Sequence, residues 1–241
     1  MRVLLTRPQA QSEELGAVLK ARAIEWLGEP LLRIMPVPWD PAVLAGPQAV
    51  LLTSANASRE LLKIPGARRD LPVFAVGPAT AAPLQTAGFS NVQAAGGTAV
   101  NLIAHVRQKV DPRAGRLLYL SGRDISLDLA SGLAPAGFEV DRVIVYRACP
   151  MERLSARTLH EMSWSRIDGA VFLSARTAAV FCSLVIASGL TDASARMTAF
   201  AISSQVAEVL KPAGFRRVVV AAAPSLDGVV EAILRLTTDD A

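Results

Sequence analysis

The sequence FAVGPATAAPLQTAGF at residues 74–89 recurs in altered form as FAISSQVAEVLKPAGF at residues 200–215. Seven of the 16 positions are identical at an offset of 126. Each copy has the pattern of a short apolar strand, a turn of small residues, a helix and a terminating glycine. A repeat at a fixed offset indicates one supersecondary unit used twice. The turn lies where a strand leads into a helix, which is a natural place to bind an anion.

Other segments extend this repeat. Residues 52–57 (LTSANA) pair with residues 172–177 (FLSART), and residues 3–7 (VLLTR) loosely resemble residues 118–122 (LYLSG). Short apolar strands alternate with helices along the chain, which favours parallel sheets covered by helices on both faces. The predicted fold class is therefore α/β, with two parallel-sheet domains related by a pseudo-repeat.

Proline-rich segments divide the chain into three pieces. A strand predicted over residues 31–37 ends before a linker near residues 38–39, and a strand over 140–146 ends before a second linker near 147–148. We expect the first piece to close onto the third. Domain one is then 1–37 plus 149–241, and domain two is 40–146. Two crossing linkers imply a hinge and a cleft between the domains.

The composition narrows the class of ligand. The net charge is +4, and 21 of the 25 basic residues are arginine. Arginine binds carboxylates with two parallel donors, so this bias suits a polycarboxylate or phosphate ligand. Taken alone, the bias is better explained by a genomic base composition that enriches arginine and alanine together. Aromatic residues are only 5% and no long basic block occurs, so we expect no nucleic-acid partner.

The cysteines and the hydropathy indicate a soluble protein of a reducing compartment. The only two cysteines, Cys149 and Cys182, lack the spacing of metal ligands. Apolar runs are too short for a signal peptide or a membrane span. We therefore expect a cytoplasmic monomer that does not bind membranes.

Candidate binding groups follow the predicted strands. In an open α/β sheet, ligands bind outside the carboxyl ends of the strands. The loops there carry hydroxyls, small residues or arginine at helix starts: 6–7, 53–56, 77–80, 121–123, 174–176 and 203–205. Helix capping explains each single loop as well. Ser12 is in the same way a predicted cap for the first helix, with Glu13 and Glu14 in its first turn. Six such loops at one edge favour a binding face.

Several common chemistries lack their signature residues. His105 and His160 fall on predicted helices without acidic or thiol partners, and the chain has no phosphate-loop, dinucleotide-binding or nucleophile-elbow motif. An enzyme of this kind works without metal or cofactor, by orienting its substrate and stabilising charge. Tyr146, which ends a strand just before the second linker, can donate a proton there. Packing in the core is an equally simple role for this side chain.

In order along the chain, these segments resemble the uroporphyrinogen-III synthase family. The matching segments are LLTRP at 4–8, LTSANA at 52–57, AVGPATA at 75–81 with 88–89, Gly137 through VYR at 145–147, FLS at 172–174, residues 201–202 to 214–215, and AAAPS at 221–225. The resemblance covers essentially the whole chain. It implies two α/β domains joined by a two-stranded linker, and an activity without cofactor. That activity closes linear hydroxymethylbilane to uroporphyrinogen III with loss of water and inversion of ring D, in haem, sirohaem and cobalamin synthesis.

The resemblance also assigns roles to residues. Tyr146 is the candidate for assisting departure of the hydroxyl, Thr80 matches a threonine of the family's cleft, and Ser54 and Ser174 match its loop serines. With the loops above, the candidate residues for binding the polycarboxylate substrate are Arg7, Thr53, Ser54, Asn56, Gly77, Ala79, Thr80, Ser121, Gly122, Arg123, Ser174, Ala175, Ser203 and Ser204. Arg147 and Arg176 are further candidates for its carboxylates.

The chain departs from the family pattern at three places. The second repeat copy carries Val206 where the family has threonine, the family's Arg-Gly turn is Ser121-Gly122, and Ser126 stands where a later arginine is usual. These departures motivate an alternative function, a non-catalytic two-domain protein that binds an anionic small molecule.

Overall fold

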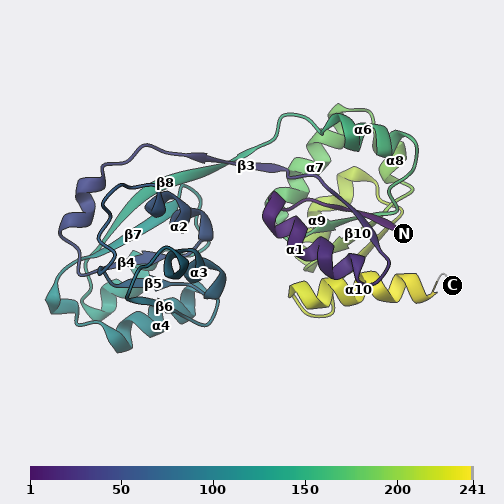
Figure 1. The fold of residues 1–241 in the computed structure, drawn as a ribbon. Coiled ribbons are helices and arrows are strands. Elements are labelled where there is room, and N and C mark those ends of the chain that lie inside the picture. Colours follow the sequence, from purple (N-terminus) through teal and green to yellow (C-terminus); the bar gives the residue numbers. More distant parts are fainter. Residues whose placement is uncertain (240–241) are drawn as a thin grey trace. The chain divides into compact units, whose positions relative to one another are not determined.

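The computed structural model describes residues 1–239, and it divides into two compact α/β units (Figure 1). Unit 1 combines Met1–Arg33 with the chain from Cys149 onward, and unit 2 is Ile34–Ala148. Both crossings between the units lie inside strands, β3 (Leu32–Pro36) and β8 (Val140–Pro150). Strand β8 thus continues through residues 147–150, where the sequence suggested a linker.

Unit 1 is built on a five-stranded sheet in the order β11-β10-β9-β1-β2, in which all paired neighbours are parallel. Its strands are β1 (Arg2–Leu5), β2 (Glu25–Gly28), β9 (Gly169–Phe172), β10 (Thr198–Ala201) and β11 (Arg217–Val220). Its helices are α1 (Gln9–Lys20), α6 (Ala156–Ser163), α7 (Ala175–Ala187), α8 (Thr191–Ser194), α9 (Ser204–Leu210) and α10 (Leu226–Asp239).

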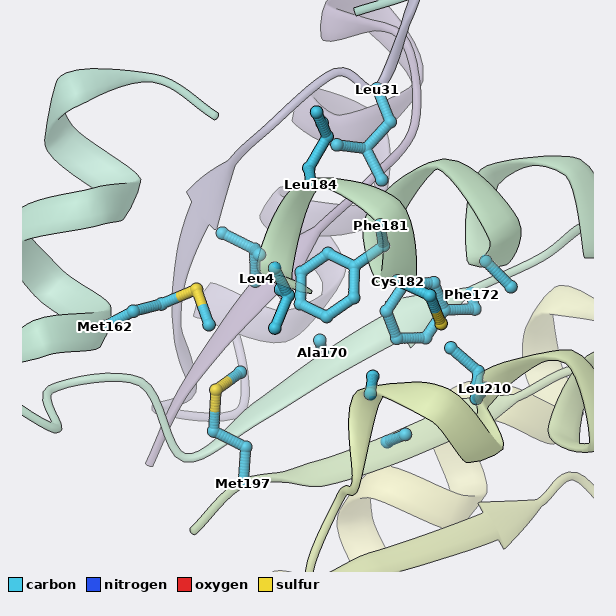
Figure 2. Close-up of a cluster of buried hydrophobic side chains, with 14 of the residues drawn as sticks. Leu4, Leu31, Met162, Ala170, Phe172, Phe181, Cys182, Leu184, Met197 and Leu210 are labelled. Carbon is cyan, nitrogen blue, oxygen red and sulfur yellow. The ribbon is translucent and has the colours of Figure 1, made fainter. Parts of the chain in front are cut away.

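Alternating side chains of the unit 1 strands fill two core layers. Leu4 of β1 belongs to the layer that includes α7, whereas its neighbours Val3 and Leu5 belong to the layer that includes α1 and α10. This is the period of two that a strand buried on both faces requires. Phe172 of β9 and Phe181 of α7 meet edge to face, with ring centroids 5.0 Å apart (Figure 2).

Unit 2 is built on a six-stranded sheet in the order β3-β8-β7-β4-β5-β6. Its other strands are β4 (Ala49–Leu52), β5 (Val73–Ala75), β6 (Val92–Ala94) and β7 (Leu117–Gly122), and its helices are α2 (Ala55–Leu62), α3 (Pro78–Thr86), α4 (Ala99–Lys109) and α5 (Leu129–Leu133). Short 3-10 turns occur at Pro41–Ala45, Pro112–Ala114 and Ala134–Ala136, with a fourth in unit 1 at Lys211–Ala213.

The duplication is visible in the sheet orders. In unit 2, β8-β7-β4-β5-β6 repeats the arrangement β2-β1-β9-β10-β11 of unit 1. Strands β7 and β8 therefore take the places of β1 and β2, although they follow β4–β6 in the chain. The predicted fold class, two pseudo-repeated parallel-sheet α/β domains, is confirmed.

Some local predictions were wrong. Helix α1 begins at Gln9 with Pro8 at its N-cap, so Ser12 lies inside the helix and its hydroxyl donates to the carbonyl of Arg7 at 3.0 Å. The fixed φ of proline suits a helix start, which allows the helix to begin before the serine. Glu13 and Glu14 consequently lie beyond the first turn. None of the helices among residues 1–239 is long and apolar enough to span a membrane.

The packing of β2 against α1 gives a stability prediction. A Cβ on Gly16 of α1 would overlap the indole ring of Trp26 in β2. We expect Gly16→Ala to lower the free energy of unfolding by about 1–3 kcal/mol through overpacking, even though alanine favours helix. Denaturant unfolding measures this loss. Glu13→Ala, on the exposed face of the same helix, is the control, and an unchanged midpoint for Gly16→Ala would contradict the close packing of Trp26.

Candidate functional site

The best candidate site in each unit lies between two neighbouring strands whose onward connections lead toward opposite edges of the sheet. In unit 2 this point is between β7 and β4, and in unit 1 it is between β1 and β9. Ligands of open α/β sheets bind in the crevice outside the carboxyl ends of such strands. The predicted loops 53–56 and 121–123 flank the point in unit 2, and loops 6–7 and 174–176 flank it in unit 1.

Tyr146 lies against Gly122 at the carboxyl end of β7 in unit 2. The two residues pair across β7 and β8, just after a register shift between Ser121 and Gly122. A Cβ on Gly122 would stand 2.7 Å from Cζ and 2.9 Å from the hydroxyl oxygen of Tyr146. Tyr146 is half-buried, and Gly122 is the residue that leaves room for its phenol.

Arg142 holds the turn that follows β7. Its Nε donates to Oγ of Ser121, and its Nη2 donates to the carbonyls of Gly122 and Arg123, all at 2.8 Å. The amide of Arg123 donates in turn to the carbonyl of Tyr146 at 2.9 Å. Ser121 is only 1% exposed, and its hydroxyl is used inside this network. Arg142 was not among the predicted site residues.

Tyr119 connects β7 to the loop after β4. Its hydroxyl lies 2.8 Å from Oγ1 of Thr53, although the ring is 1% exposed. Burial raises the pKa of the Tyr119 phenol, while the hydrogen bond to Thr53 and the positive charge of Arg142 act in the opposite direction. The phenol therefore stays neutral near pH 7 and fixes the position of the Thr53 hydroxyl. Tyr119 too was absent from the predicted set.

The remaining predicted residues of unit 2 lie in the loops that begin α2 and α3. Oγ of Ser54 caps α2 by accepting from the amide of Asn56 at 3.1 Å. Gly77 is the buried N-cap of α3, where a Cβ would lie 3.3 Å from Cα of Gly97. Ala79 is exposed, whereas Thr80 is 5% exposed and its carbonyl accepts from the hydroxyl of Ser58.

The predicted residues of unit 1 flank β1, β9 and β10. Burial lowers the pKa of the Arg7 guanidinium, opposed by the charge of Glu14, and the group remains cationic at neutral pH. Beside it, the hydroxyl of Thr6 donates to the carbonyl of Val171 at 2.7 Å and joins the ends of β1 and β9.

Serine caps begin two helices on the same edge of unit 1. Ser174 accepts from the amide of Thr177 at 3.1 Å, with Ala175 as the first residue of α7. Ser203 accepts from the amide of Val206 at 3.4 Å, and Ser204 is exposed. These hydroxyls satisfy helix amides, as the capping interpretation expected.

The structure thus brings five predicted residues together in unit 2: Thr53, Ser121, Gly122, Arg123 and Tyr146. Arg142 and Tyr119 add an arginine and a second phenol near this end of β7, although Tyr146 and Tyr119 pack on different buried clusters. Such a set can hold a carboxylate and donate a proton. Among residues 1–239, no three His, Cys, Asp or Glu side chains are gathered so that they can hold a metal ion.

Comparisons with known proteins agree with this architecture. The model of a family described as uroporphyrinogen-III synthase HemD matches residues 13–231. Uroporphyrinogen-III synthetase from Helicobacter pylori 26695 has a similar structure, with a TM-score of 0.64 and 19% identity, over 98% of this chain and 100% of that one. A mutant uroporphyrinogen III synthase from the extremely thermophilic bacterium Thermus thermophilus is similar with a TM-score of 0.53 and 19% identity, over 99% of each chain. A comparison with curated protein sequences gives no match. Since the family match spans most of the chain, the protein belongs to the uroporphyrinogen-III synthase HemD family.

Proposed function

We propose that this protein is a uroporphyrinogen-III synthase, a cyclising hydro-lyase of tetrapyrrole synthesis that acts on hydroxymethylbilane. The observation that carries the proposal is the placement of Tyr146. Its phenol lies against Gly122 at the carboxyl end of β7, one of the two strands that flank the switch point of the unit 2 sheet, and ligands of open α/β sheets bind near such points. Membership of the family supports the same reaction.

The reaction begins with one proton transfer. The ring A hydroxyl leaves as water when Tyr146 donates its phenolic proton, and an azafulvenium cation remains. The substituted carbon of ring D attacks this cation to give a spirocyclic pyrrolenine, which fragments and recloses with ring D inverted. The proton released on reclosure restores the phenol, so the net change is loss of one water without oxidation or reduction.

The surrounding residues would orient the substrate and stabilise charge. Hydroxymethylbilane carries eight carboxylates, which helix N-termini and arginines bind well. In unit 2 such groups are the starts of α2 and α3. Holding ring D so that its substituted carbon reacts before its free position is catalysis by proximity. We further propose that the protein acts as a cytoplasmic monomer without cofactor.

Incubation with freshly prepared hydroxymethylbilane tests the proposal. The products are oxidised and the type I and type III isomers are separated by chromatography. We expect type III product at a rate that scales with protein concentration. Formation of type I product alone, at the rate of a protein-free control, would contradict the synthase assignment. If such a protein still bound uroporphyrin III, it would be the non-catalytic anion-binding protein that the departure at Val206 suggests.

A further inference from the structure

Arg142 of β8 is tied to the neighbouring turn and is nevertheless exposed to solvent. It donates three hydrogen bonds to the turn of residues 121–123. The carbonyls of Gly122 and Arg123 lie at and beyond the register shift that ends regular pairing of β7 with β8. Nη2 of Arg142 donates to the carbonyl of Arg123 and shares the carbonyl of Gly122 with the hydroxyl of Ser121. The arginine therefore fixes the local backbone next to Tyr146.

The charge of Arg142 is not neutralised by this network. Within residues 1–239, no carboxylate lies at ion-pair distance from its guanidinium, and its partners are a hydroxyl and two carbonyls. The positive charge of Arg142 does act on Asp128, whose pKa is lowered mainly by the hydrogen bond from Ser131 and to a smaller extent by Arg142. The oxygens of Asp128 accept from the amide of Ala130 and the hydroxyl of Ser131 at the start of α5. The two Nη1 hydrogens make no hydrogen bond in the described part of the chain.

We propose that Arg142 binds one carboxylate of the substrate through Nη1 and, through Nε and Nη2, positions the turn against which Tyr146 lies. An arginine held by its other donors loses little side-chain freedom when it binds, and Nη1 still offers two hydrogens and a positive charge to a carboxylate. The inference rests on the proposed function, because it takes the ligand to be a polycarboxylate. It also explains how a turn with Ser121-Gly122 in place of Arg-Gly acquires a positive charge: the charge comes from the neighbouring strand.

The test uses full-length Arg142→Gln and Arg142→Lys variants, with Arg107→Gln as the matched control. Arg107 is an exposed arginine in the last turn of α4, also in unit 2. The probe is uroporphyrin III, a stable octacarboxylate whose fluorescence reports its dissociation constant. We expect Arg142→Gln to weaken binding by about tenfold or more, as for loss of a charged hydrogen bond. Arg142→Lys keeps the charge but loses the hydrogen bonds that hold the turn, so its effect is smaller. Arg107→Gln binds as the unmodified protein does.

The dependence of binding on salt separates a binding role from a structural one. A carboxylate bound by Arg142 makes affinity fall with ionic strength, and Arg142→Gln flattens that slope. Equal slopes for the unmodified protein and Arg142→Gln would overturn the proposal, even if the variant melts at a lower temperature. Absence of uroporphyrin III binding by the unmodified protein would overturn it as well. If binding depends on Arg142 but hydroxymethylbilane yields no type III product, the synthase assignment fails and the carboxylate site stands.

Discussion

Replacing Tyr146 with phenylalanine is expected to slow formation of type III product by about 10²- to 10⁴-fold, the range for loss of a general acid. The ring packs on the buried cluster of unit 2 that contains Leu118, Leu120 and Val145, and phenylalanine preserves that contact. Only the hydroxyl of Tyr146 is lost, which is the group proposed to protonate the leaving hydroxyl of the substrate. The measurement is the single-turnover rate of isomer III formation, with the isomers separated after oxidation.

Binding and stability serve as controls for Tyr146→Phe. The variant should bind uroporphyrin III as tightly as the unmodified protein and unfold at nearly the same temperature, because the aromatic contact remains. A variant that keeps the full rate would remove Tyr146 from the mechanism and leave substrate orientation as the source of catalysis. Weaker binding together with a normal rate at saturation would make Tyr146 a binding residue.

The fold could be predicted because its strands are buried on both faces. Short runs such as Ala49–Leu52 and Leu117–Leu120 are apolar throughout, and the repeat shows which run corresponds to which. Strand β2 was not predicted, because Trp26 and Leu27 are its only large apolar residues and they stand between Glu25 and Gly28. Helix α6, on which His160 was expected to lie, was predicted without bounds, because ARTLHEMS is largely polar and only two of its residues are buried.

Only part of the site could be predicted from the sequence, because the contacts of Tyr119 and Arg142 depend on strand pairing. Loop residues such as Thr53 and Gly122 could be found because they follow apolar strands. Tyr119 and Arg142 lie inside strands, where a sequence reading assigns side chains to the core or to solvent. Their roles depend on the register that places Tyr119 opposite Arg142 and on the shift after Ser121. No local pattern encodes a contact between residues so far apart in the chain.

The two repeat copies both bury the position at which threonine is exchanged for valine. Thr80 of the first copy and Val206 of the second are 5% and 3% exposed, so each is buried near the start of its helix. The exchange of threonine for valine replaces one buried side chain with another of similar size. The hydroxyls that distinguish the units in the described structure lie elsewhere, on Thr53 and Tyr119 in unit 2.

Gly122→Ala is the second substitution for which we expect a large effect. The backbone of Gly122 does not adopt a positive φ, so alanine is not excluded by conformation. It is excluded by space, because the new methyl group would stand 2.7 Å from Cζ of Tyr146. The phenol must move, and a displacement of the order of 1 Å at a reacting group costs about 10²-fold in rate. Overpacking should also lower the free energy of unfolding by about 1–3 kcal/mol.

A double variant shows whether the loss of rate passes through the phenol. If alanine at 122 acts by displacing the Tyr146 hydroxyl, it should slow Tyr146→Phe very little, so the two effects on rate are strongly non-additive. The loss of stability should persist in the double variant, because the phenylalanine ring meets the same methyl group. Gly46→Ala is the matched control, since its Cβ would approach only the flexible end of Arg116 in the same unit. Fully additive effects on rate, or a normal rate for Gly122→Ala alone, would show that the contact between Gly122 and Tyr146 does not position the reacting group.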